Sequence, residues 1–414
     1  MNNEGFYKLP IEERRKRLLE EGKLTEEELS LLDRSLDVNV ADKMTENVIG
    51  TFSLPYSLAM NFKINGKELL VPMVTEEPSV VAAASNAAKM SLPQGFTASS
   101  NPSIMIGQIQ LVNLEDPENA LKNVLGQKEK LLEMANSTDS TIVKLGGGAK
   151  GIEGKILATS RGKMLVLHLL VDVKDAMGAN AVNTICELIS PEIEKITGGE
   201  ARLRILSNLA IHRLVKASAI WKKDLLGEGT IEKILDAYEF AASDQFRATT
   251  NNKGIMNGIS AVCLATGNDT RAVEAACHSY ASFRETGKYL PFAKYSKNEN
   301  GDLEGEIELP LAVGIVGGAT KTLPLAQLSL KIMGVKSASE LAETMACVGL
   351  ANNFAALRAL ATEGIQRGHM ELHARNVAIA AGAEGEQIEK IAEQMAKEKN
   401  ISSARAKELL TEET

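Results

Sequence analysis

The stretch Thr75-Glu76-Glu77-Pro78-Ser79 joins two carboxylates to a run of alanine and serine residues that continues to Ser85. A helix built from such small side chains lets a backbone or a ligand approach closely, and Pro78 is suited to its first turn. The glutamates would then stand at the mouth of the helix, where one of them could present an acid to a bound substrate. Taken alone, the stretch also fits a capped and tightly packed core helix.

A lysine lies among small and amide side chains in the stretch Asn252-Lys253-Gly254-Ile255-Met256-Asn257-Gly258. An apolar run, residues 259–266, follows it, so we expect Lys253 at the mouth of a mostly buried helix. An ammonium in such a place needs a neighbouring carboxylate to stay charged. Asp269 offers one in Gly267-Asn268-Asp269, about one helix downstream. The spacing allows this contact without establishing it.

Two histidines lie at i and i+4 in Gly368-His369-Met370-Glu371-Leu372-His373, on one face of a helix. A zinc protease motif needs Glu directly after the first His, and here it comes two residues later. We therefore predict no metal site, and a zinc hydrolase is only an alternative. Because glycines 364 and 368 precede it on a polar tail, His369 is predicted to be a proton donor delivered by a closing flap.

Two glycine-containing stretches could contact a cofactor. Gly146-Gly147-Gly148-Ala149-Lys150-Gly151 satisfies G-x-G-x-x-G, but residues 152–173 read as two strands, so the helix that a Rossmann site needs is absent. Asp175-Ala176-Met177-Gly178-Ala179-Asn180 follows an apolar strand and opens a helix, whose free N–H groups could receive a phosphate. A simple aspartate cap on that helix fits the second stretch equally well.

Composition limits the class of protein. The 414 residues suffice for roughly two to three domains, and 44% hydrophobic with 24% charged residues is typical of a globular protein. The net charge of −8 argues against nucleic acid as a partner. No apolar run is long enough to cross a membrane, the N-terminus shows no secretion signal, and the four cysteines are widely spaced. We expect reduced thiols in a cytoplasmic protein.

Periodicity predicts an α+β fold. Charged helices are expected in residues 10–36, a hairpin around Asn65-Gly66, and mostly helices after residue 208, with a second hairpin in residues 290–316. Between them lies a β-α-β-β-α-β pattern with an extra strand, typical of a ferredoxin-like (split βαβ) unit inserted in a larger domain. Its strands are predicted at 104–112, 141–145, 154–159, 164–173 and 202–207, and its helices at 116–135 and 177–197.

As a set, these motifs are highly specific. ENVIG (residues 46–50), TEEPSVVAAAS, DAMGAN, NKGIMNG with GND, and GHMELHARN have the order and spacing seen in class II 3-hydroxy-3-methylglutaryl-CoA (HMG-CoA) reductases, which the chain resembles over residues 40–380. The resemblance implies a large, mostly helical acyl-CoA-binding domain (1–102 and 208–364), an inserted non-Rossmann NAD(P)-binding domain (103–207) and a helical C-terminal flap (365–414). It also implies a homodimer or dimer of dimers, with active sites at the subunit interface.

The resemblance further implies a four-electron reduction of HMG-CoA to mevalonate and CoA, in the mevalonate pathway of isoprenoid synthesis. Two NAD(P)H would be used, and mevaldyl-CoA hemithioacetal and mevaldehyde would be intermediates. Lys253 would stabilise the oxyanion, with Asp269 holding its ammonium. His369 would protonate the CoA thiolate, since an imidazolium (pKa about 6.5) is a stronger acid than a thiol (about 8.5). Glu77 would protonate the final alkoxide.

By the same resemblance, the substrate contacts would be Ser79, Asn208, Arg247 and Asn257, with Arg247 on the free carboxylate. The cofactor contacts would be Gly146, Gly147, Gly148, Lys150, Asp175, Met177, Gly178 and Asn180. NADH-preferring relatives place an acidic residue where this chain has Lys150-Gly151, which favours NADPH, with NADH as the alternative.

Two positions depart from the family pattern: Asn251 replaces a frequent His, and Thr270 a frequent Trp. Both put local packing in question. Two other functions stay open: the same enzyme in mevalonate catabolism, where it would be an NAD-dependent oxidative acylase, and a non-catalytic acyl-CoA-binding relative.

Overall fold

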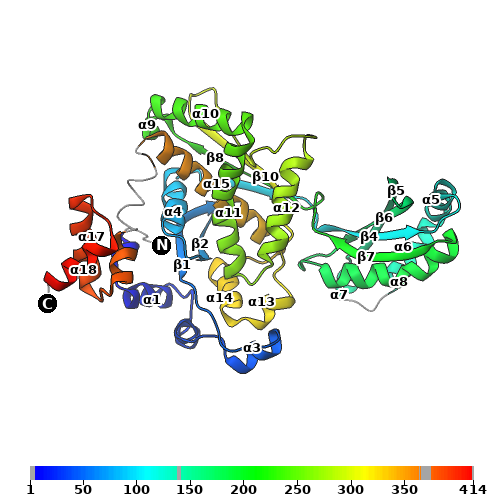
Figure 1. Ribbon diagram of the computed structural model, residues 1–414, viewed down its shortest axis with the longest axis horizontal. Helices are drawn as coiled ribbons and strands as arrows, with labels where there is room; N and C mark the ends of the chain where they lie inside the picture. Colours follow the sequence, from blue (N-terminus) through cyan, green and yellow to red (C-terminus); the bar gives the residue numbers. More distant parts are fainter. Residues whose placement is uncertain (1–4, 138–140, 363, 365–373, 413–414) are drawn as a thin grey trace.

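The computed structural model describes residues 5–137, 141–362, 364 and 374–412. The fold is α+β, as the sequence predicts, with two separate sheets. Figure 1 shows a central body around the larger sheet, a module with the smaller sheet at one end of the long axis, and the C-terminal helices at the other. No helix in the described part of the chain is long and apolar enough to cross a membrane.

The larger sheet has six strands in the order β2-β1-β3-β8-β10-β9. Neighbours run antiparallel except β1 and β3. The predicted Asn65-Gly66 turn joins β1 to β2, with Ile64 opposite Lys67, and the predicted second hairpin is β9–β10. The strands are β1 (Tyr56–Ile64), β2 (Lys67–Val74), β3 (Phe96–Ser100), β8 (Leu214–Trp221), β9 (Ala293–Lys297) and β10 (Leu303–Pro310).

Helices pack closely on this sheet because their contact residues are small. The helix α15 (Ala338–Ala361) contacts β3, β8 and β10 and runs against α11 (Gln245–Ala265). Two glycines permit the approach: a Cβ at Gly258 would lie 2.9 Å from Val348, and one at Gly349 would lie 2.9 Å from Ile259. The other helices of the body are α4 (Val80–Met90), α9 (Lys223–Leu226), α10 (Glu228–Ser243), α12 (Thr270–Phe283), α13 (Gly318–Thr322) and α14 (Pro324–Met333).

The smaller sheet is antiparallel throughout, in the order β5-β6-β4-β7. This is the strand order of a split βαβ unit. Its helices cover one face, and Ile109, Leu167 and Ile189 are among the side chains of its separate core. The elements are β4 (Ile104–Val112), α5 (Pro117–Gly126), α6 (Lys128–Asn136), α7 (Thr141–Lys144), β5 (Gly148–Thr159), β6 (Gly162–Asp172), α8 (Ala179–Thr197) and β7 (Glu200–Ser207).

Two predicted elements of this module are wrong. The extra strand at 141–145 is the short helix α7, because local bonds from the N–H of Gly146 to Val143 and of Gly147 to Ile142 close turns there. The single helix at 116–135 is two helices that meet at Gln127, whose φ of −110° interrupts the helical path. The glycine stretch leads into strand β5, so the Rossmann arrangement is correctly excluded.

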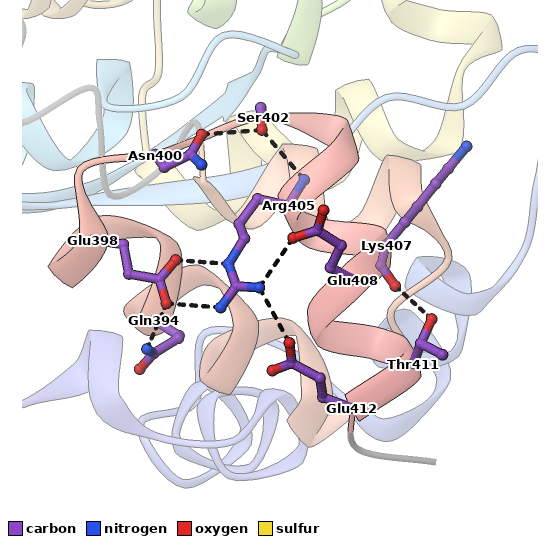
Figure 2. Close-up of polar contacts among 9 residues, drawn as sticks. All are labelled: Gln394, Glu398, Asn400, Ser402, Arg405, Lys407, Glu408, Thr411 and Glu412. Carbon is purple, nitrogen blue, oxygen red and sulfur yellow. Dashed lines mark hydrogen bonds and ion pairs between the residues drawn. The ribbon is translucent and has the colours of Figure 1, made fainter.

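The described C-terminal residues are helical and have a core of their own that includes Ala378, Ile391 and Leu409. Residues 374–381 form one helix, followed by α17 (Glu386–Glu398) and α18 (Ser403–Glu412). Figure 2 shows Arg405 of α18 bonded to Glu398, Glu408 and Glu412. The bond from Arg405 lowers the pKa of Glu398 to about 2. These contacts tie α18 to α17 at any ordinary pH.

At the N-terminus, Thr25 and Glu28 form a capping box at the start of α2. The elements there are η1 (Phe6–Lys8), α1 (Ile11–Glu20), α2 (Glu26–Leu29), η2 (Ser30–Asp33) and α3 (Val38–Met44). This arm packs through Phe6, Leu18 and Leu24 against Leu70 of β2 and Leu328 of α14.

Candidate active site

Glu77, Lys253 and Asn257 meet in one cluster. The Nζ of Lys253 donates to Glu77 Oε2 at 2.7 Å, and the Nδ2 of Asn257 donates to Glu77 Oε1 at 3.0 Å. Both carboxylate oxygens are therefore engaged. Lys253 and Asn257 are four residues apart on α11 and share a face. The lysine side chain is 61% exposed and that of Glu77 35%, so the pair is open to an incoming ligand.

The loop that presents Glu77 ends at an unusual residue. Helix α4 begins at Val80, so Pro78 lies in the preceding turn and the prediction that it opens the helix is wrong. Ser79 takes the N-cap position with φ 75°, a left-handed conformation that L residues rarely adopt, and its hydroxyl makes no capping bond. Strained backbone conformations of this kind are concentrated at functional sites.

Glu77 and Ser79 line an open cleft of about 2700 Å³. Residues that precede β1 also line it, including Gly50 of the ENVIG motif and Phe52. Pockets for drug-sized ligands have volumes of about 300–1,000 Å³. The cleft is therefore large enough for a long, extended ligand.

Buried asparagines lie behind the lysine, and the sequence analysis did not identify them as a group. Asn353 of α15 donates to Asn251 Oδ1 at 2.8 Å and accepts from the hydroxyl of Tyr295 at 3.0 Å. Asn252 accepts from the N–H of Phe292 and donates to the carbonyl of Leu290. These bonds fix α11 on its neighbours one and two residues before Lys253. The sequence feature that could have revealed these buried asparagines is a pair of consecutive asparagines inside an apolar helix, as at residues 352–353.

The contacts of Asn251 explain how it fits where relatives often have His. Its side chain is 4% exposed and bonded to α15, so the packing around this position is satisfied.

Asp269 does not hold Lys253 within one chain. Its carboxylate accepts from the N–H groups of Arg271 and Ala272 at the start of α12 and pairs with the Arg271 guanidinium at 3.2 Å. No ion pair joins it to Lys253 among the described residues. The reason is helical geometry: α11 spans residues 245–265, so Lys253 lies in its middle, not at its mouth. Twelve residues to the helix end correspond to about 18 Å.

Glu274 of α12 is a further carboxylate near this cluster, and sequence reasoning missed it. It accepts from Ser260 at 2.6 Å and pairs with His278 at 3.0 Å. Burial raises the pKa of Glu274, but the bonds from His278 and Ser260 and the charge of Lys253 lower it overall. The other ring nitrogen of His278 bonds to the hydroxyl of Tyr289. A Glu and a His four residues apart on one helix was the available signal.

Of the other predicted substrate contacts, Arg247 is in the first turn of α11, where burial lowers the pKa of its guanidinium. It lies six residues before Lys253, about 9 Å along the helix, and no carboxylate pairs with its guanidinium in the described part of the chain. Asn208 is exposed directly after β7. His369 lies outside the described residues. Within those residues, no group of His, Cys, Asp or Glu side chains could hold a metal ion.

The two predicted cofactor stretches lie side by side. Gly148 pairs with Asp172 across β5 and β6, and a Cβ at Gly147 would come within 2.5 Å of the Asp172 carbonyl oxygen. Gly146, with φ 78°, has nothing within 4 Å of its Cβ position, so a ligand can approach its backbone. Lys150 is exposed and donates to the Gly146 carbonyl at 3.0 Å. An open glycine edge with an adjacent lysine fits a phosphorylated dinucleotide.

The second stretch opens α8 differently from the simple cap considered above. Gly178, φ 102°, is the N-cap and supplies no side chain, so the first N–H groups of α8 are not capped by one. Met177 is partly buried and Asn180 is exposed beside it. The carboxylate of Asp175 instead accepts from the N–H of Ala338 at 2.8 Å, at the start of α15. Asp175 therefore links the module to the central body.

Comparison with known proteins identifies the family in which this fold and this site occur. The family model for hydroxymethylglutaryl-coenzyme A reductase matches residues 10–374. A 3-hydroxy-3-methylglutaryl-coenzyme A reductase of Archaeoglobus fulgidus is 56% identical over 98% of this chain and 93% of its own length. A probable reductase of Borreliella burgdorferi is 40% identical, over 90% of this chain and 87% of its own.

Among solved structures, the class II reductase of Streptococcus pneumoniae, bound to NADPH in open conformations, is 40% identical. It matches with a TM-score of 0.82, over 98% of this chain and 99% of its own. The fold and the relatives identify the protein as an oxidoreductase. It belongs to the hydroxymethylglutaryl-coenzyme A reductase family, and its solved neighbours are of class II.

Proposed function

We propose that the protein reduces HMG-CoA to mevalonate and CoA with two equivalents of NADPH, as a cytoplasmic homodimer in isoprenoid synthesis. The observation that carries this proposal is the cluster of Lys253, Glu77 and Asn257, which joins a cation, an acid and an amide beside an open cleft. A protein that only bound acyl-CoA would have no need of a paired acid and ammonium. The membership of the family supports the substrate.

Each residue has a defined task in this proposal. The ammonium of Lys253 stabilises the negative charge that develops on the thioester oxygen, and later that on the aldehyde oxygen. When bound, the cofactor supplies the hydride for each of the two reductions. Collapse of the mevaldyl-CoA hemithioacetal expels a thiolate, which His369 protonates. Glu77, after taking up a proton from solvent, transfers it to the final alkoxide and so forms the alcohol.

Different parts of the chain bind the acyl-CoA and the cofactor. Acyl-CoA binds to the central body, residues 1–102 and 208–364, with Ser79, Asn208, Arg247 and Asn257 on the acyl group. The module of residues 103–207 holds NADPH through its glycine edge, Lys150 and the loop from Asp175 to Asn180. Residues 365–414 act as the flap that brings His369 to the thiolate. Because Asp269 lies beyond the end of α11, while Lys253 is in the middle of that helix, we propose that the partner subunit's Asp269 completes the site at the dimer interface.

The test is the oxidation of NADPH and, separately, of NADH by the purified protein with HMG-CoA. We expect two cofactors consumed per mevalonate formed, with the higher rate for NADPH. Absence of oxidation with either cofactor, in folded dimeric protein, would favour the acyl-CoA-binding alternative. Faster oxidation of mevalonate with NAD and CoA than reduction of HMG-CoA would favour the catabolic role.

His369→Gln is expected to stop reduction of HMG-CoA while sparing reduction of free mevaldehyde. Only the thioester reaction expels a thiolate, so only that reaction needs this proton. Rates with the two substrates, measured on the same preparation, separate the outcomes. Equal loss of both reactions would show that His369 has another role. His373→Gln, four residues on, is the control and should retain both.

Lys150→Glu is expected to lower kcat/KM for NADPH about tenfold or more, with little loss for NADH. A carboxylate repels a 2′-phosphate and accepts a bond from a 2′-hydroxyl, and a charged hydrogen bond is worth about 1.5–3 kcal/mol. Lys155→Glu makes the same charge change at an exposed position farther along β5 and serves as the control. An unchanged ratio of the two cofactors in Lys150→Glu would remove Lys150 from the cofactor site.

A further inference from the structure

One buried arginine holds the loop of Asp175 and Met177 from outside the small module. Arg213 lies where the chain returns from the module to β8, and it is 4% exposed. Its guanidinium donates to the carbonyls of Ala176 and Met177, both at 3.2 Å, and to that of Val313 at 2.7 Å. Two backbone segments far apart in sequence therefore meet on one side chain.

Within the described part of the chain, the Arg213 guanidinium is held without a paired carboxylate. Burial lowers the pKa of Arg213 to about 10, and the charges of Asp172 and Asp175 act in the opposite direction. The guanidinium bonds to carbonyl oxygens only, without a carboxylate in direct contact. Burying a charge is costly. An apolar side chain of similar volume would avoid that cost, but it could not fix the carbonyls of the loop.

A second anchor holds the same loop. The N–H of Ile315 donates to the carbonyl of Asp175 at 2.9 Å. Gly314 allows this approach, because a Cβ there would lie 2.5 Å from the nitrogen of Met177. Asn268 in turn holds Gly314 by two bonds, of 2.8 and 3.0 Å. Residues 313–315 thus connect the loop to the segment that begins with Asn268 and Asp269.

We propose that Arg213 is a positioning residue for the nicotinamide cofactor, because it locks the loop of residues 175–178 onto residues 313–315 of the central body. This inference rests on the proposed function, in which that loop binds NADPH. A loop held by its carbonyls presents its remaining groups in one fixed geometry, which lowers the ordering cost of binding. Release of the loop weakens cofactor binding and leaves acyl-CoA binding intact.

The experiment compares Arg213→Met with Arg284→Met by titrating each full-length protein with NADPH and following the fluorescence of the bound cofactor. Arg284 is a matched control: its guanidinium also donates to backbone carbonyls, those of Leu290 and Pro291, but it is only partly buried and lies in the central body at the end of α12. We expect Arg213→Met to raise the Kd for NADPH about tenfold or more. The Kd for CoA, measured by calorimetry, should stay unchanged in both variants.

Two further variants keep the test decisive if Arg213→Met folds poorly. Gly314→Ala leaves the arginine in place but pushes on Met177, and it should also raise the Kd for NADPH. Arg213→Lys keeps a charge that can reach one carbonyl and should recover part of the affinity. An unchanged Kd in both Arg213→Met and Gly314→Ala, or an equal loss of CoA binding, would overturn the inference. Failure of the wild-type protein to bind NADPH would instead refute the proposed function.

Discussion

Replacement of Lys253 by Ala is expected to lower kcat for HMG-CoA by about 100- to 1000-fold, because loss of one donor to a developing oxyanion has that effect in other enzymes. The side chain is 61% exposed, so its removal leaves no buried cavity. The loss should extend to reduction of free mevaldehyde, since both reductions place charge on the same oxygen. Stopped assays with each substrate measure the two rates.

The matched control is Lys331→Ala. Lys331 of α14 and Glu28 of α2 form an ion pair with similar exposure, 48% and 26% for the two side chains. Such pairs contribute about 0–1 kcal/mol to stability, so this variant should keep the wild-type rate and melting temperature. A Lys253→Ala enzyme that retained half its activity would exclude the oxyanion role. A fall in activity that matched a fall in the amount of folded protein would also exclude the oxyanion role.

Mixing two inactive variants is expected to restore activity. Within one chain Asp269 is bonded to Arg271 and the start of α12, while Lys253 is bonded to Glu77. If the partner subunit's Asp269 completes each site, a heterodimer of Lys253→Ala and Asp269→Asn chains contains one intact site. Random exchange makes about half of the dimers heterodimers, so about a quarter of the wild-type activity should return.

The control for this experiment mixes Lys253→Ala with Glu77→Gln. These two residues lie in the same site of one chain, at 2.7 Å, so each site of that heterodimer contains one damaged residue. No activity should return. Restored activity in the control, or none in the Lys253 and Asp269 mixture after verified subunit exchange, would place Asp269 in the same chain's site. Size measurement before and after mixing confirms that dimers have exchanged.

Local patterns in the sequence predicted most of the elements because short-range physics governs them. The Asn65-Gly66 hairpin and the Ile104–Val112 strand are both present. The errors occurred where short-range signals compete. Residues 141–145 are rich in β-branched side chains, yet they form a helix because the following glycines fold back on it.

The motif set alone established the family, and with it the candidates Glu77, Lys253, Asp269 and His369. Only the tertiary structure decided which of them meet. Glu77 and Lys253 are 176 residues apart in the chain, and Asp175 reaches the start of α15 across 163 residues. Such partners depend on how helices pack against the sheet, for which sequence periodicity carries no information. Arg213 shows this most clearly: as a sequence position it has no motif, and its role follows from the three carbonyls around it.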